Sequence, residues 1–175
     1  MLIFLYGPDD WRREEKAKSI VSEFKKRRST LGLGVFDFSE ESAFEDFLVF
    51  SRSQSVFSAA KMIVLRGVPG LGDPIRIAGE LKKLAKEEKT TALLSERAKP
   101  AGADFGFLLR PPVSSQKFDF LAGRQWEDFV RLRAAEFGIR LSREALFLLA
   151  AAYRGDTWSL MTELRKIRDF GQNEI

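Results

Sequence analysis

Residues 4–14 read FLYGPDDWRRE and place an apolar run directly before a Gly-Pro turn and a basic segment. The run at 3–6 is short and uniformly apolar, which is typical of a buried strand, and Gly7-Pro8 ends it. The segment that follows repeats apolar residues at helical spacing, namely Ala17, Ile20, Val21 and Phe24. A strand, a tight turn and an amphipathic helix in this order predict the opening of an α/β unit.

The alternation of strand and helix continues outward from this stretch to about residue 120. Further strands are predicted at 35–38, 61–65, 90–94 and 117–120, and 61–65 is apolar on both faces, like a central parallel strand. Helices are predicted to start at Ser42, which opens a Ser-x-x-Glu capping box, and at Asp73-Pro74. A short helix is expected within 105–109.

After Gly123 the pattern changes to three helices in a row. Ser142 and Asp156 are predicted caps, Gly155 is the predicted stop between them, and Trp158 is expected to point inward. We therefore predict an α/β fold with a P-loop-like parallel sheet and flanking helices in 1–121, and a small three-helix bundle in 122–175.

The composition excludes several kinds of chemistry. None of the 175 residues is cysteine or histidine, which excludes disulfides, thiolate nucleophiles, structural zinc sites and imidazole bases. No apolar run approaches the ~20 residues of a membrane span, and the N-terminus lacks the basic region of a signal peptide. We expect a cytoplasmic protein with no membrane partner.

The turn at residues 7–14 occupies the place of a phosphate-binding loop but lacks its chemistry. Such a loop has the form Gly-x-x-x-x-Gly-Lys-Ser/Thr. Here Gly7 is present, but Arg12 replaces the second glycine, Arg13 the lysine, and Glu14 the hydroxyl that would hold Mg²⁺. The third strand ends in Leu65-Arg66 rather than in metal-binding acids. We predict a degenerate phosphate loop, with no catalytic residue, no metal and no cofactor.

Asp9 and Asp10 admit two interpretations. Paired carboxylates after a first strand can hold Mg²⁺ in a phosphoacceptor pocket, but that pocket also needs an acceptor Asp after the third strand, and none is present. The favoured interpretation is that Asp9 or Asp10 caps the following helix.

Two features suggest binding rather than catalysis. Gln54-Ser55-Val56-Phe57 precedes the central strand, and its apolar pair is either core or a protruding anchor for a partner protein. From Trp11 to Arg28 there are eight basic and three acidic residues. This segment is either a solvated helix face or, as the alternative function, a nucleic-acid-binding surface on a basic helix spanning Arg12 to Arg28.

Taken together, these residues resemble the delta subunit of bacterial DNA polymerase III, a clamp-loader protein of the AAA+ superfamily. The resemblance covers most of the chain. It rests on 4–15, on Ser55-Val56-Phe57-Ser58 followed by 61–65, and on 81–94. The most specific part is 126–170, with Gly138-Ile139-Arg140-Leu141-Ser142, Gly155-Asp156 and Glu163-Leu164-Arg165-Lys166-Ile167.

The resemblance implies an AAA+ module that does not hydrolyse ATP, followed by a lid domain, with the family's collar domain absent from this chain. It implies the beta sliding clamp, the delta prime and tau/gamma subunits, and primed DNA as partners. Val56 and Phe57 match the pair that enters the clamp, with Val where the family usually has Leu, and Gln54 and Ser55 are flanking contacts. The rivals are an active ATPase and delta prime, which usually carries a cysteine zinc site.

Overall fold

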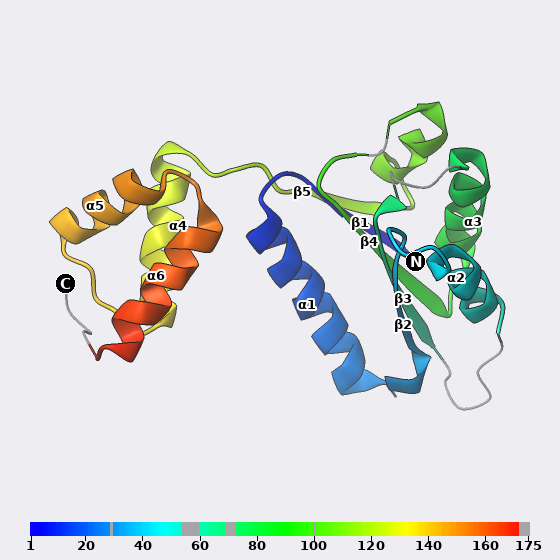
Figure 1. The fold of residues 1–175 in the computed structure, drawn as a ribbon, viewed down its shortest axis with the longest axis horizontal. Coiled ribbons are helices and arrows are strands. Elements are labelled where there is room, and N and C mark those ends of the chain that lie inside the picture. The colour runs from blue at the N-terminus through cyan, green and yellow to red at the C-terminus, as the bar shows by residue number, and fades with distance from the viewer. Residues whose placement is uncertain (29, 54–59, 69–72, 100, 172–175) are drawn as a thin grey trace. The chain divides into compact units, whose positions relative to one another are not determined.

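The computed structural model describes residues 1–28, 30–53, 60–68, 73–99 and 101–171. The chain divides into two compact units, Met1–Phe118 and Asp119–Ile175. The first unit is built on a five-stranded sheet and the second is helical (Figure 1).

The sheet has the strand order β2-β3-β4-β1-β5, and every neighbouring pair is parallel. The strands are β1 (Leu2–Tyr6), β2 (Leu33–Asp37), β3 (Lys61–Arg66), β4 (Thr90–Glu96) and β5 (Ser114–Lys117). The predicted parallel sheet is confirmed. Strand β5 begins three residues before the predicted range of 117–120. All four of its side chains are polar and exposed, so no apolar pattern marks it in the sequence, and only backbone pairing with β1 defines it.

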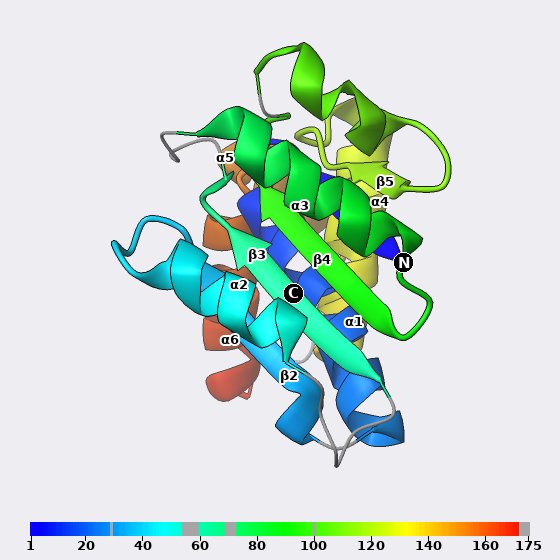
Figure 2. The ribbon, with the colours of Figure 1, turned by 90° about the vertical axis from the view of Figure 1, so that its right-hand side faces the viewer.

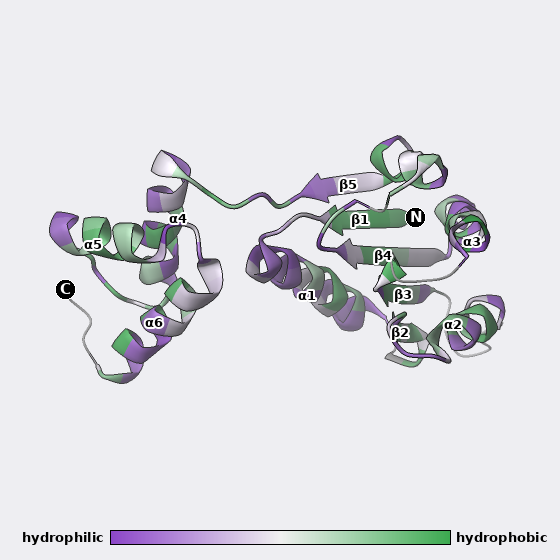
Figure 3. Cartoon of the chain, turned by 45° about the horizontal axis from the view of Figure 1, so that its top comes forward, coloured by the Kyte–Doolittle hydropathy of each residue, from purple (hydrophilic) through white to green (hydrophobic). Residues whose placement is uncertain are grey.

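Helices cover both faces of this sheet. Helix α1 (Asp10–Arg27) lies on one face, and α2 (Ala43–Arg52) and α3 (Pro74–Lys86) lie on the other (Figures 1 and 2). Short 3₁₀ helices span Thr30–Gly32 and Ala103–Leu109. Side chains alternate along each strand, so Phe4 and Leu65 join the core under α2 and α3, whereas Leu5 and Val64 join a smaller core under α1. The hydropathy colouring shows the apolar flank of α1 turned toward the strands (Figure 3).

The helical unit contains α4 (Gly123–Glu136), α5 (Arg143–Tyr153) and α6 (Thr157–Asp169). Its buried side chains include Trp126, whose indole N–H donates to the carbonyl of Ala150 at 3.0 Å. The predicted caps Ser142 and Asp156 are confirmed, because each side chain accepts a backbone N–H three residues later. None of the described helices combines the length and hydropathy needed to cross a membrane.

Two local predictions are wrong. Trp158 is 49% exposed, because the inward stripe of α6 runs through Thr157, Leu160 and Leu164 and leaves Trp158 one position outside it. Ser42 does not cap α2, since its backbone is already helical, with φ −89° and ψ −12°. Its hydroxyl lies 3.1 Å from Asp46 Oδ2 instead.

Candidate functional site

The turn that follows β1 lies at the edge of the sheet where the carboxyl ends of the parallel strands meet. Tyr6 lies opposite Glu96 and Asp37 lies opposite Arg66, so the ends of four neighbouring strands meet at one edge of the sheet. This edge is where open α/β sheets hold ligands.

Gly7 makes the turn from β1 into α1. Its φ is +129°, and a Cβ at this position would lie 2.3 Å from the carbonyl oxygen of Phe118, so no other residue fits without displacing backbone. The turn's backbone donors are engaged, since Gly7 N donates to Glu96 O at 3.2 Å and Asp9 N to Phe118 O at 3.0 Å. Asp9 is the helix cap, its Oδ1 accepting from Arg12 N at 3.1 Å.

Arg13 is buried inside this turn, with 7% of its surface exposed. Its Nε donates to Ser95 Oγ at 3.1 Å, and its Nη1 donates to Gly7 O at 2.5 Å and to Asp10 Oδ1 at 2.7 Å. The guanidinium therefore binds three acceptors of the protein itself, one in the turn after β1, one in α1 and one in β4. The sequence pattern marks Arg13 as part of the degenerate phosphate loop but does not indicate these partners.

Glu14 and Arg66 form an ion pair between the second turn of α1 and the end of β3. Arg66 Nη2 donates to Glu14 Oε2 at 2.7 Å. Across the described residues, no group of three or more acidic side chains is arranged to hold a metal ion. The two residues are thus engaged with each other.

Glu96 is a buried carboxyl group that sequence analysis missed. It is 6% exposed, and its Oε1 accepts the backbone N–H of Val68 at 2.9 Å. Burial raises the pKa of Glu96 to about 7, and the negative charge of Asp37 adds to the rise, whereas the Val68 hydrogen bond and the charge of Arg13 oppose it. The available signal was its position, a carboxylate two residues after the predicted end of a buried strand.

Asp37, at the end of β2, is held differently. It accepts hydrogen bonds from the hydroxyl and the backbone N–H of Ser39 at 2.7 and 3.0 Å. These hydrogen bonds lower the pKa of Asp37, so it stays charged at neutral pH. The edge thus combines one carboxylate that is fixed in charge with one that titrates near neutrality.

Gln54, Ser55, Val56 and Phe57 lie outside the described residues. The described chain on either side is tied together by Lys61, the first residue of β3. Its Nζ donates to the carbonyl oxygen of Phe50 at 2.9 Å, to that of Ser51 at 3.3 Å and to that of Ser53. Burial lowers the pKa of Lys61. This side chain satisfies carbonyls at the C-terminus of α2, a role that the sequence did not reveal.

The basic residues of α1 fall into three groups. Arg12 and Arg13 lie near the turn, Lys16 and Lys18 lie in the middle of the helix, and Lys25, Lys26 and Arg27 occupy its last turn. In this last part, Glu23 pairs with Lys26 at 3.0 Å and with Arg27 at 3.6 Å. The nucleic-acid interpretation of this helix stays a prediction.

No protein-family model and no curated protein matches the sequence. Solved structures with the same fold include a DNA clamp loader protein and a branch migration motor. The Bacillus subtilis DNA clamp loader delta protein YqeN is 16% identical, with a TM-score of 0.63 over 99% of this chain and 55% of that one. The Thermotoga maritima RuvB Holliday junction branch migration motor is 12% identical, with a TM-score of 0.64 over 99% and 57%. The chain thus has an AAA+-type α/β fold and spans little more than half the length of these neighbours.

Proposed function

We propose that this chain is a non-hydrolysing, delta-type clamp-loader subunit that binds and opens a sliding clamp during DNA replication. Its partners would be the beta clamp, the other loader subunits and, within that complex, primed DNA. The similarity of the fold to a DNA clamp loader delta protein supports this proposal. Because the fold is equally similar to that of a branch migration motor, the residues of the phosphate loop are what distinguish a loader subunit from a motor.

The observation that carries the proposal is the position of Arg13. P-loop proteins that hydrolyse nucleotides bind the phosphates with backbone N–H groups and a lysine of the loop. They also need acidic side chains that hold Mg²⁺. In this chain Arg13 binds Gly7, Asp10 and Ser95, and the end of β3 presents Arg66 in place of an acid. The turn is therefore filled by the protein's own side chain, which favours a loader subunit over a motor.

The proposed mechanism is differential binding. Val56 and Phe57 would enter an apolar pocket of the clamp, with Gln54 and Ser55 beside them. A ligand shifts a ring toward opening only by the amount by which it binds the open interface more tightly than the closed one. Lys61 supports this role, because it fixes the end of α2 against the start of β3 and so holds the two ends of the proposed anchor segment.

The test is to measure binding to the cognate sliding clamp for wild type, Phe57→Ala and Phe170→Ala. Phe170 is a matched control, because it is a phenylalanine 81% exposed on the other unit. Loss of an anchor side chain at the centre of an interface costs about 2 kcal/mol or more. We therefore expect Phe57→Ala to weaken binding at least about tenfold and Phe170→Ala to leave it unchanged.

Two results would contradict the proposal. One is a Phe57→Ala protein that keeps the wild-type circular dichroism spectrum and thermal midpoint and binds the clamp as tightly as wild type. The other is calorimetric binding of ATP with Mg²⁺ followed by turnover, which would place the chain with the motors.

A further inference from the structure

Among the described residues of the unit Met1–Phe118, the face of the sheet that carries α1 is only partly covered. Parallel sheets are as a rule covered by helices on both faces. On this face α1 packs against β1 and β4, with Met62 and Val64 of β3 beneath it. At the edge strand β2 the side chain of Val35 is 60% exposed, although its register partner Val64 is 3% exposed.

A groove of about 390 Å³ runs between α1 and this uncovered part of the sheet. Its lining includes Val21 from α1, Val64 from β3 and Val35 from β2. The position corresponds to that of a second helix in an α/β layer, beside α1 and over the edge of the sheet.

Cationic side chains line the same groove. Lys18 and Lys25 come from α1, and Arg66 comes from the end of β3. Lys18 meets Glu15 only in an exposed pair, which screens its charge weakly. Lys25 has no carboxylate within ion-pair distance among the described residues. Arg66 holds Glu14, but its Nε is a buried donor that meets no acceptor in the described part of the chain.

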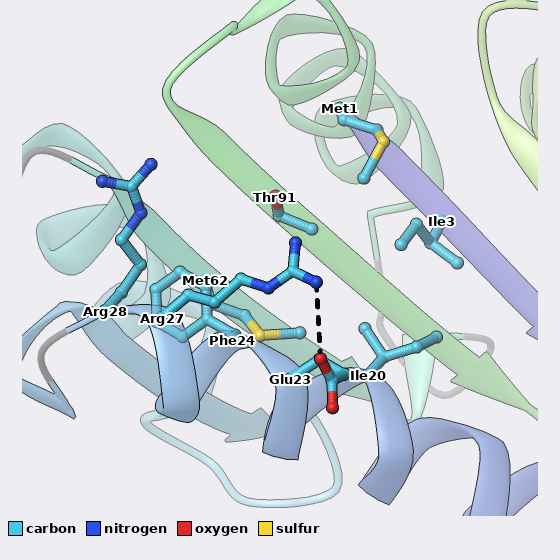
Figure 4. A pocket seen from close by; sticks show the side chains of 9 residues that line it. All are labelled: Met1, Ile3, Ile20, Glu23, Phe24, Arg27, Arg28, Met62 and Thr91. Carbon is cyan, nitrogen blue, oxygen red and sulfur yellow. Dashed lines mark ion pairs between the residues drawn. The ribbon is translucent and has the colours of Figure 1, made fainter.

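The other flank of α1 is less suited to an anionic ligand. It carries a pocket of about 270 Å³ whose lining contains Glu23 as well as Arg27 and Arg28 (Figure 4). Glu23 and Arg27 pair at 3.6 Å there, so a carboxylate already stands where an acidic partner would approach.

We propose that the groove between α1 and β2 binds an amphipathic helix of a partner protein. Apolar side chains of that helix would cover Val35 and Val64, and acidic side chains along its flanks would face Lys18, Lys25 and Arg66. The aliphatic floor distinguishes this occupant from nucleic acid, because single strands bind on aromatic platforms and duplexes through phosphates. The groove's described lining holds no aromatic side chain.

The probe is a fluorescein-labelled 18-residue peptide designed as a helix, with leucines on one face and glutamates on both flanks. A matched peptide carries lysine in place of every glutamate. We expect the glutamate peptide to bind the full chain at least about tenfold more tightly in fluorescence anisotropy, with affinity falling as salt is raised.

Substitutions inside and outside the groove test whether the peptide binds there. Val35→Asp puts a charge on the proposed floor at an exposed position, and Val49→Asp makes the same change at a side chain 71% exposed on α2. We expect about a tenfold loss for Val35→Asp, a smaller loss for Lys25→Glu, and wild-type affinity for Val49→Asp. Phe57→Ala is expected to bind the peptide as wild type does, which separates this proposal from the clamp.

The proposal is overturned if both peptides bind equally, if neither binds, or if Val35→Asp and Lys25→Glu bind as wild type does. It is also overturned if a 20-nucleotide oligo-dT binds more tightly than the glutamate peptide and only Lys25→Glu weakens it, because the surface would then be one for nucleic acid.

Discussion

Arg13 and Glu96 show how single side chains at the carboxyl edge set what this fold can do. A guanidinium presents several donors spread over a fixed plane, so Arg13 binds Ser95 through Nε while its Nη1 binds Gly7 and Asp10. Glu96 lies beside it, buried and bonded to Val68. Together they make this edge a bonded network rather than an open cradle.

The first prediction concerns the pH dependence of stability through Glu96. Its folded pKa of about 7 lies above the ordinary glutamate value of 4.5, so between these values the folded state holds a proton that the unfolded state has released. Stability is therefore lost as pH rises from about 4.5 through 7, by about 3 kcal/mol in all. Glu96→Gln, measured by urea unfolding at pH 5, 6, 7 and 8, should remove most of this fall.

Glu41→Gln is the matched control for that series, because it makes the same change at an exposed side chain. It should follow the wild-type pH profile. A Glu96→Gln protein whose stability falls with pH as steeply as that of wild type would show that Glu96 is ionised throughout in the folded state.

At the scale of elements, a helix-start residue acts as a cap only where its side chain accepts a backbone N–H of the first turn. Asp9, Asp73, Ser142 and Asp156 each accept the backbone N–H three residues later. Ser42 has a capping-box sequence but no such bond. The difference lies in the backbone, because the four caps have non-helical ψ angles, which let the side chain reach the first turn, whereas Ser42 is already helical.

We expect Asp156→Ala to lower the free energy of unfolding by about 1 kcal/mol and Ser42→Ala to change it by less than about 0.5 kcal/mol. Hydrogen bonds from Ser159 lower the pKa of Asp156, so its contribution is present above the ordinary Asp pKa and is lost as pH falls through the lowered folded value. Denaturant unfolding at pH 7 and pH 3 measures both effects. Equal losses for the two variants at pH 7 would refute the distinction.

At the scale of the whole molecule, the chain consists of two units with separate cores. Phe118 belongs to the first, because its N–H donates to Tyr6 O at 2.7 Å and its carbonyl accepts from Asp9. Leu121 belongs to the second, because its carbonyl oxygen lies close to Gly155. Units joined in this way are expected to open independently.

Gly155→Ala tests that independence. A Cβ at Gly155, where φ is +90°, would lie 2.8 Å from Leu121 O, whereas one at Gly138, where φ is +75°, meets nothing within 4 Å. Both changes cost backbone strain of about 1 kcal/mol or more, but only Gly155→Ala adds a clash. We expect it to speed amide exchange throughout 119–171 by more than Gly138→Ala does.

Peptides from 1–118 should exchange at wild-type rates in both glycine variants. Faster exchange spreading into the sheet of Gly155→Ala, measured by mass spectrometry on the full chain, would mean that the two units unfold as one.

The sequence by itself determined the order and type of most elements, the parallel sheet and the caps Asp73, Ser142 and Asp156, and it narrowed the cap of α1 to Asp9 or Asp10. Periods of 2 and 3.6 and cap residues act over a few neighbouring positions, so local sequence is enough to show them. Only the tertiary structure decided the polar strand β5, the buried carboxyl of Glu96, and the partners of Arg13 and Arg66. The bonds from Arg13 to Ser95 and from Arg66 to Glu14 join residues 82 and 52 positions apart. Their formation, like the burial that raises the pKa of Glu96, depends on which strands become neighbours in space, and no local pattern encodes that.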